Sequence, residues 1–169
     1  MVLLKGLRGH GAQSRGPSIV RTISTPGGHY HEHGKTHLAV ALGYEACLKG
    51  HAVLFTSAID IIHTLLAAKN TGRLKQEIKK YVKPALLLLD ELGYLPIDKS
   101  GADLLFQVIS ARYEHGSTLI TSNRAFKEWP KIFNNDSTLT SALLDRLLHH
   151  AETIIIEGKS YRMKGKLDV

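Results

Sequence analysis

The chain has 169 residues, 43% of them hydrophobic and 22% charged, a composition typical of one globular domain rather than of a disordered or fibrous chain. Its 22 lysines and arginines against 15 acids give a net charge of +7, which favours a polyanionic partner such as nucleic acid. No apolar run approaches the roughly 20 residues of a membrane helix, and the start lacks a secretory signal. We therefore expect a cytoplasmic protein without a membrane partner.

The single cysteine, Cys47, excludes a disulfide framework within the chain and fits a reducing compartment. It lies in an apolar stretch with helical character. Because free cysteines are usually buried, we expect an inert thiol in the core.

The chain changes character at about residue 34. Residues 1–33 are rich in glycine, contain one acid, Glu32, and show no sustained helical period. Their only strand-like run is 18–23. We interpret residues 1–33 as an atypical N-terminal segment, either disordered or translated out of frame, and residues 34–169 as the core domain.

Beyond residue 34, predicted helices and strands alternate in chain order. Helices are expected over 36–49, 61–70 (capped by Ser57 or Asp60), 73–82, 100–114, 126–133 and 137–149. Strands are expected over 51–56, 85–89, 118–121, 153–156 and 160–163. This alternation predicts an α/β fold with a mainly parallel sheet flanked by helices. Ligands bind at the carboxyl ends of such strands, which directs attention to Ser57, Asp90 with Glu91, and Ser122 with Asn123.

The triplet Gly34-Lys35-Thr36 opens a predicted helix with the residue types of a phosphate-binding loop. Glycine lets backbone N–H groups wrap phosphates, lysine reaches the terminal phosphates, and threonine offers a hydroxyl to Mg²⁺. The positive end of the helix dipole adds to the attraction. These three residues alone also fit an ordinary loop that enters a helix and carries a surface lysine.

The apolar run 85–89 ends in two acids, Asp90 and Glu91. Such a run is typical of a strand buried on both faces, as in a parallel sheet. At its tip Asp90 can hold the water shell of Mg²⁺, and Glu91 can polarise an attacking water as general base. Two solvated acids are the ordinary alternative, but with the earlier triplet they supply the parts needed for nucleoside triphosphate hydrolysis.

Two further positions join the candidate set. Asn123, at the tip of strand 118–121, can hold the attacking water or the terminal phosphate. Arg146, on helix 137–149, can reach a neighbouring subunit's phosphates in trans. For Arg146, an intrahelical or surface ion pair is the ordinary alternative.

From Gly34 to about Lys164 the sequence resembles the insertion-sequence transposition helper ATPases (IstB-like), which are close to the helicase loader DnaC and the initiator DnaA in the AAA+ class of P-loop ATPases. The resemblance is carried by GKTHLAVALG (34–43), LLLLDELGYLP (86–96), LLFQVISARYEHGSTLITSNRAFKEW (104–129) and LLDRLLHHAETIIIEGKSYR (143–162).

The resemblance implies ATP and Mg²⁺ as cofactors. It implies nucleotide contacts from Gly28, Gly34, Lys35, Thr36 and Asp90, with Thr36 and Asp90 holding the metal ion. It also implies catalytic roles for Glu91 as the Walker B acid, Asn123 as sensor 1 and Arg146 as the arginine finger. The implied partners are DNA, further copies of the chain assembled on it, and the transposase of the same element.

The sequence departs from the family pattern at the phosphate-binding loop. The family reads Gly, four residues, then Gly-Lys-Thr, directly after a buried strand, whereas here His29 stands five before Gly34 and Gly28 lies one residue too far. The intervening residues 29–33 are bulky and partly acidic, which is unfavourable at positive φ and beside a triphosphate. We therefore expect a degenerate first strand and loop. A coding frame disrupted just upstream of Gly34 is one explanation.

Several alternatives stay open at this stage. The chain is either a Mg²⁺-dependent ATPase that assists transposition or an ATPase-deficient remnant that binds DNA or a partner. The basic group Lys75, Lys79, Lys80 and Lys83 faces either DNA phosphates or solvent. The alternating His29, His31 and His33 allow a Zn²⁺ or Cu²⁺ site, although no cysteine or carboxylate cluster completes it.

Overall fold

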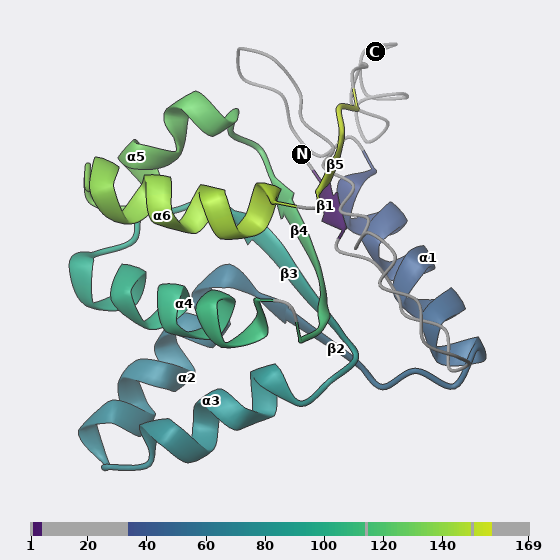
Figure 1. Ribbon diagram of the computed structural model, residues 1–169, viewed down its shortest axis with the longest axis horizontal. Helices are drawn as coiled ribbons and strands as arrows, with labels where there is room; N and C mark the ends of the chain where they lie inside the picture. The colour runs from purple at the N-terminus through teal and green to yellow at the C-terminus, as the bar shows by residue number, and fades with distance from the viewer. Residues whose placement is uncertain (1, 5–33, 114, 150, 157–169) are drawn as a thin grey trace, which may run out of the picture.

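The computed structural model describes residues 2–4, 34–113, 115–149 and 151–156, and shows one sheet with helices on both faces (Figure 1). This is the α/β architecture that the alternation of strands and helices predicts. The expected strands at 18–23 and 160–163 lie outside the described residues, as do Gly28 and the histidines at 29, 31 and 33.

Five strands form the sheet in the spatial order β2-β3-β4-β1-β5. Strands β2 (Val53–Ser57), β3 (Leu86–Leu92) and β4 (Ser117–Ser122) are parallel, as expected. Strand β1 (Val2–Leu4) lies between β4 and β5 (Glu152–Ile154) and is antiparallel to both. The sequence pattern does not predict β1, because an apolar run of three residues is too short to show a period.

Strands β3 and β4 form the centre of the core. Leu86, Leu87, Leu88 and Leu89 are each at most 2% exposed, which confirms a strand buried on both faces, and β4 is buried throughout its length. Because β2, β3 and β4 run in the same direction, their carboxyl ends meet at one edge of the sheet. Asp90 lies at this edge, and Asn123 follows directly after β4.

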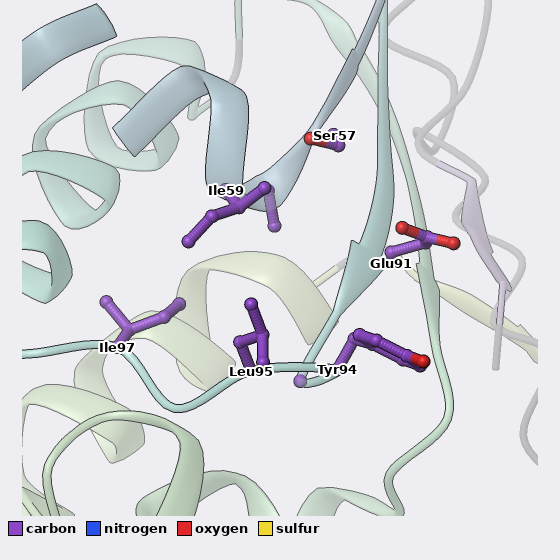
Figure 2. Close-up of a pocket in the computed structure, with 8 residues that line it drawn as sticks. Ser57, Ile59, Glu91, Tyr94, Leu95 and Ile97 are labelled. Carbon is purple, nitrogen blue, oxygen red and sulfur yellow. The ribbon is translucent and has the colours of Figure 1, made fainter. Parts of the chain in front are cut away.

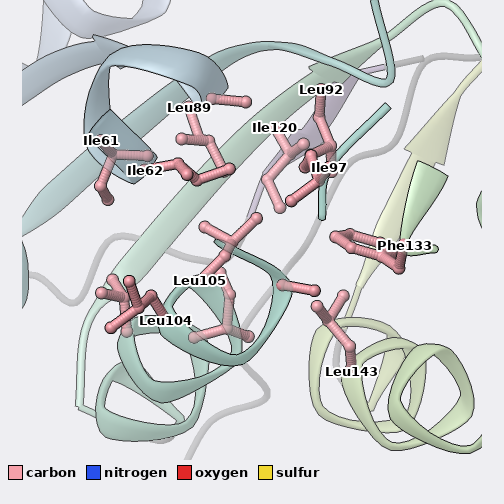
Figure 3. Close-up of a cluster of buried hydrophobic side chains, with 14 of the residues drawn as sticks. Ile61, Ile62, Leu89, Leu92, Ile97, Leu104, Leu105, Ile120, Phe133 and Leu143 are labelled. Carbon is pink, nitrogen blue, oxygen red and sulfur yellow. The ribbon is translucent and has the colours of Figure 1, made fainter. Parts of the chain in front are cut away.

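One face of the sheet is covered by helices α2 (Ala58–Asn70), α3 (Leu74–Val82), α4 (Lys99–Arg112) and α6 (Ser137–Leu148) (Figure 1). Side chains at the N-caps fix where three of them begin, because Ser57, Asp98 and Asp136 accept hydrogen bonds from backbone N–H groups of the first turn. Between these helices and the sheet lies the larger core, which includes Ile61, Leu89, Leu105, Ile120, Phe133 and Leu143 (Figure 3).

The short helix expected over 126–133 is divided in two. A 3₁₀ turn, η1 (Phe126–Glu128), leads into one helical turn, α5 (Trp129–Ile132). Trp129 and Phe133 are fully buried and pack edge to face at 6.1 Å between ring centroids. These aromatic side chains anchor the segment that follows Asn123.

Helix α1 (Lys35–Leu48) covers the opposite face of the sheet (Figure 1). Its buried side presents small residues, Ala39, Gly43 and Ala46, to the leucines of β3. A Cβ built on Gly43 would lie 2.6 Å from Cδ1 of Leu88, so the helix approaches the strand this closely only because that position is a glycine.

The outer side of α1 is apolar as well, and it corrects the expectation for Cys47. Val40, Tyr44 and Leu48 are 49%, 62% and 64% exposed, and Cys47 is exposed with them. Cys47 follows the buried Ala46, and one residue turns a helix by about 100°. Its thiol therefore points away from the sheet rather than into the core.

A buried arginine holds the amino ends of β3 and β4 together. Arg112, at the end of α4, is 1% exposed. Its guanidinium donates hydrogen bonds to the carbonyls of Tyr81, Val82, Pro84 and Ser117 and to the hydroxyl of Thr118. Burial lowers the pKa of Arg112 to about 10, so the side chain remains charged at neutral pH. This contact fixes the amino ends of two strands: β3, which carries Asp90, and β4, which Asn123 follows.

Candidate functional site

Helix α1 begins at Lys35 with no capping side chain. Gly34 precedes it with φ +72°, a conformation that glycine adopts without strain. No side chain accepts a hydrogen bond from the cap, and the first turn holds no acid. The free N–H groups and the positive end of the helix dipole make such a helix start suitable for binding an anion.

The side chains of Lys35 and Asp90 lie near each other at this edge of the sheet. Lys35 is 8% exposed and Asp90 is 5% exposed. Burial lowers the pKa of Lys35 below its ordinary value, and the negative charge of Asp90 opposes this shift. The fold thus brings the glycine–lysine–threonine triplet and the paired acids into one site.

A threonine on the neighbouring strand holds the two acids in place. The hydroxyl of Thr121 donates a hydrogen bond to Oδ1 of Asp90 and accepts one from the backbone N–H of Glu91 at 2.9 Å. Sequence reasoning did not single out Thr121. The signal that could have found it is its place two residues before Asn123, at the carboxyl end of the predicted strand 118–121.

Three other candidates are exposed at the same edge. Glu91 ends the acidic pair, Asn123 follows β4, and Thr36 is the second residue of α1. Next to them, Nε of Arg124 lies 3.5 Å from the carbonyl oxygen of Gly93, on the turn after the acids. The site therefore offers a hydroxyl, a carboxylate and an amide to a ligand above the sheet.

Arg146 lies elsewhere on the molecule. Its guanidinium is 4.8 Å from the ring centroid of Phe106, and its Nη1 donates a hydrogen bond to the carbonyl of Ala142 at 2.9 Å. Within the described residues it forms no ion pair, and no described contact joins it to Lys35 or Asp90.

A small, mostly apolar hollow adjoins Glu91 on the side of β2. Figure 2 shows it lined by side chains from the end of β2, the start of α2 and the turn after β3: Ser57, Ile59, Glu91, Tyr94, Leu95 and Ile97. Lys35 and Asp90 are not part of its lining. The polar site and this hollow are therefore neighbours that share Glu91.

Two kinds of feature are absent from the described part of the chain. Across residues 34–113 and 115–149 and the short strands, no group of three or more His, Cys, Asp or Glu side chains could hold a metal ion. Mg²⁺ does not need such a cluster, because it keeps several waters and binds through one or two carboxylates plus substrate phosphates. In the same residues, no helix is long and apolar enough to cross a membrane.

Comparisons with known proteins agree on one family. Residues 25–169 match the model of the IstB-like ATP binding proteins. A protein of Geobacillus stearothermophilus, named as an ATP-binding protein of insertion sequence IS5376, is 45% identical over 133 residues, or 79% of this chain and 53% of that protein. A protein of Pseudomonas aeruginosa with the corresponding name for insertion sequence IS21 is 46% identical over 79% of this chain and 50% of its own length.

Solved structures support the fold. A crystal structure of the DnaC helicase loader matches with a TM-score of 0.64 and 26% identity, over 82% of this chain and 78% of the loader. A structure of DnaA from Aquifex aeolicus with bound AMPPCP matches with a TM-score of 0.65 and 24% identity, over 81% of this chain and 40% of DnaA. The chain spans about half the length of the curated relatives it matches.

Proposed function

Because the chain belongs to the family of IstB-like ATP-binding proteins and has the AAA+ P-loop fold, we propose that residues 34–169 form the ATPase core of an insertion-sequence protein that assists transposition. The observation that carries this proposal is that Lys35 and Asp90, both buried and of opposite charge, lie near each other at an uncapped helix start. A buried lysine beside a carboxylate and free N–H groups fits a triphosphate with its metal ion.

Each residue of the site has a role in this proposal. Lys35 and the N–H groups of α1 neutralise the phosphates, while Thr36 and Asp90 hold Mg²⁺. Glu91 orients the attacking water and accepts its proton, and Asn123 binds the terminal phosphate. Bound Mg²⁺ would supply the positive charge that stabilises the transferring phosphoryl group.

Arg146 has its proposed role between subunits. Since its described contacts are with Phe106 and Ala142, it would complete the site of a neighbouring copy as an arginine finger. In this proposal the active form is a homo-oligomer assembled on DNA, acting with the transposase of the same element.

Four exposed lysines on and after α3 are proposed to contact DNA: Lys75, Lys79, Lys80 and Lys83. Of these, Lys80 is 2.7 Å from a carboxylate oxygen of Glu77, which holds its head group in place on the helix surface. Each phosphate neutralised on duplex DNA contributes about 0.9 to the slope of log affinity against log salt concentration. Replacing all four by glutamine should therefore reduce this slope by up to about 3.6. Replacing the exposed Lys127 and Lys131 is the control, and an equal loss in both variants would remove DNA contact from α3.

One observation favours the second candidate, an ATPase-deficient remnant that binds DNA or a partner. The described strand beside β4 is the antiparallel β1, which ends at Leu4 rather than directly before Gly34. Residues 29–33, which depart from the family's loop pattern, also favour this candidate. Family-like residues in another reading frame of the upstream DNA would support a disrupted frame, and their absence would count against it.

A nucleotide titration tests the proposal. The protein should bind Mg-ATP, and Lys35→Ala should weaken binding by ~10- to 150-fold, the range expected for one charged hydrogen bond of about 1.5–3 kcal/mol. Glu91→Gln should bind ATP but no longer hydrolyse it. Undiminished binding by Lys35→Ala would remove the phosphate role from this lysine. Binding without turnover in the parent would favour the second candidate.

A further inference from the structure

The hydrogen-bond ladder between β3 and β4 skips one residue at the site. Leu89 lies opposite Ile120, but Leu92, three residues later, lies opposite Ser122, only two residues later. Strand β3 therefore carries an extra residue across from Thr121, which makes a β-bulge. Bulges occur beside active sites because they redirect a side chain that a regular strand would hold in the sheet.

The hydroxyl of Thr121 fills the gap that the bulge opens. Thr121 is 1% exposed, and its hydroxyl takes the N–H of Glu91 while donating to the carboxylate of Asp90. This N–H is partly buried and needs a partner, and here a side chain replaces the carbonyl of the neighbouring strand. Glu91 itself has φ +60°, a conformation uncommon for a glutamate, and the bond to Thr121 helps to hold it there.

From this geometry we propose that Thr121 is the positioning residue that sets the direction of the Glu91 carboxylate and fixes the rotamer of Asp90. The proposal rests on the ATPase function proposed above and adds a residue to it. Thr121 bonds only one oxygen of Asp90 and leaves the second for other partners. Since Asn123 follows directly after β4, the strand that holds both acids also leads to the exposed amide.

Two substitutions separate the hydroxyl from the shape of the side chain. Thr121→Val keeps the shape and removes both hydrogen bonds, and Thr121→Ser keeps the hydroxyl. By NMR-detected hydrogen exchange, the Glu91 amide should be protected in the parent and in Thr121→Ser, and should exchange at least tenfold faster in Thr121→Val. An unprotected Glu91 amide in the parent would overturn the proposal even if Thr121→Val does not fold.

Kinetics test the positioning role. In single-turnover ATP hydrolysis, Thr121→Val should lower the rate constant at least tenfold while changing the Kd for Mg-ATP less than threefold. Thr121→Ser should restore the rate. An unchanged rate in Thr121→Val, or the same loss in both variants, would refute the role. If the parent binds no ATP, the proposed function fails, while the exchange experiment still decides whether Thr121 holds Glu91.

Thr118→Val is the matched control. Thr118 is another buried threonine of β4, at the opposite end of the strand, and its hydroxyl accepts a hydrogen bond from Arg112. The Thr118→Val variant loses this bond. It should lower stability and leave both the local exchange of the Glu91 amide and the hydrolysis rate unchanged. Loss of hydrolysis in Thr118→Val as large as in Thr121→Val would show that a weakened strand alone explains the effect.

Discussion

Replacing Arg112 by methionine is expected to lower the free energy of unfolding by about 3–5 kcal/mol. The substitution leaves four carbonyls and one hydroxyl without their donor at a site that is 1% exposed. Each buried group left without a partner costs about 1–3 kcal/mol. Part of this loss is offset, because burial, which lowers the pKa of Arg112 to about 10, already opposes its charge. The remaining loss is a large fraction of the roughly 5–15 kcal/mol that stabilises a domain.

A second substitution shows whether the loss comes from the guanidinium. A Cβ built on Gly116 would lie 2.6 Å from Nη2 of Arg112 and 3.1 Å from its Cζ. Gly116→Ala should therefore cost about 1–3 kcal/mol in the parent, as overpacking usually does. In the Arg112→Met protein the same change should cost much less, because the flexible methionine can move aside.

Urea denaturation of the full chain, followed by circular dichroism, measures both effects. Arg73→Met is the control, since Arg73 is exposed and its change should stay within about 0.5 kcal/mol. A loss below about 1 kcal/mol in Arg112→Met would refute the bonding network as a source of stability. An equal cost of Gly116→Ala in both backgrounds would refute the predicted contact between the two residues.

Three further results are expected. The affinity for Mg-ATP should fall as the pH rises through the pKa of Lys35 in the empty site, because burial lowers this pKa and a triphosphate requires the ammonium form. Calorimetry in two buffers should show that binding takes up a proton, and a pH-independent affinity would contradict this. Gly93→Ala should lower the free energy of unfolding by about 1–3 kcal/mol, because Gly93 has φ +90° and a Cβ there would lie 2.6 Å from Cδ1 of Ile132; an unchanged urea midpoint would refute it. Cys47 should react with a thiol reagent in the folded protein, and a thiol that reacts only after unfolding would show that it is covered.

The fold was predictable where the hydrophobic pattern agrees with the residues that begin and end strands and helices. The run 85–89 is long, apolar and bounded by Pro84 and Asp90, so both its strand character and its burial follow from the sequence. Burial of Cys47 was predicted from the apolar stretch around it and from the usual burial of free cysteines, and it was wrong. The apolar residues of helix α1 are not gathered on one side, so its pattern does not show which side faces the sheet.

The candidate site was predictable only in part, for a physical reason. Lys35 and Asp90 belong to local patterns, a helix start and a strand end, which can be read separately and then joined by the topology of a parallel sheet. Thr121 acts through the register between two strands. A one-residue bulge leaves no mark in the sequence, so the hydroxyl opposite it becomes visible only in the structure.

The family pattern combines the residues of the phosphate site with a strand that leads directly into its loop. The direction of β1 separates these two features. Val2 pairs with Thr121 and Leu4 with Leu119, so the chain leaves β1 at the amino edge of the sheet, whereas α1 begins at the carboxyl edge. A parallel strand in this position would lead directly into Gly34. Among the described residues, the lysine, the helix start and the paired acids are present, and no parallel strand leads into Gly34. If the loop limits binding, replacing residues 29–33 by a short glycine-containing sequence should tighten Mg-ATP binding while Lys35→Ala still weakens it. Equal, tight binding by the parent and the replaced loop would show that the helix start and Asp90 suffice.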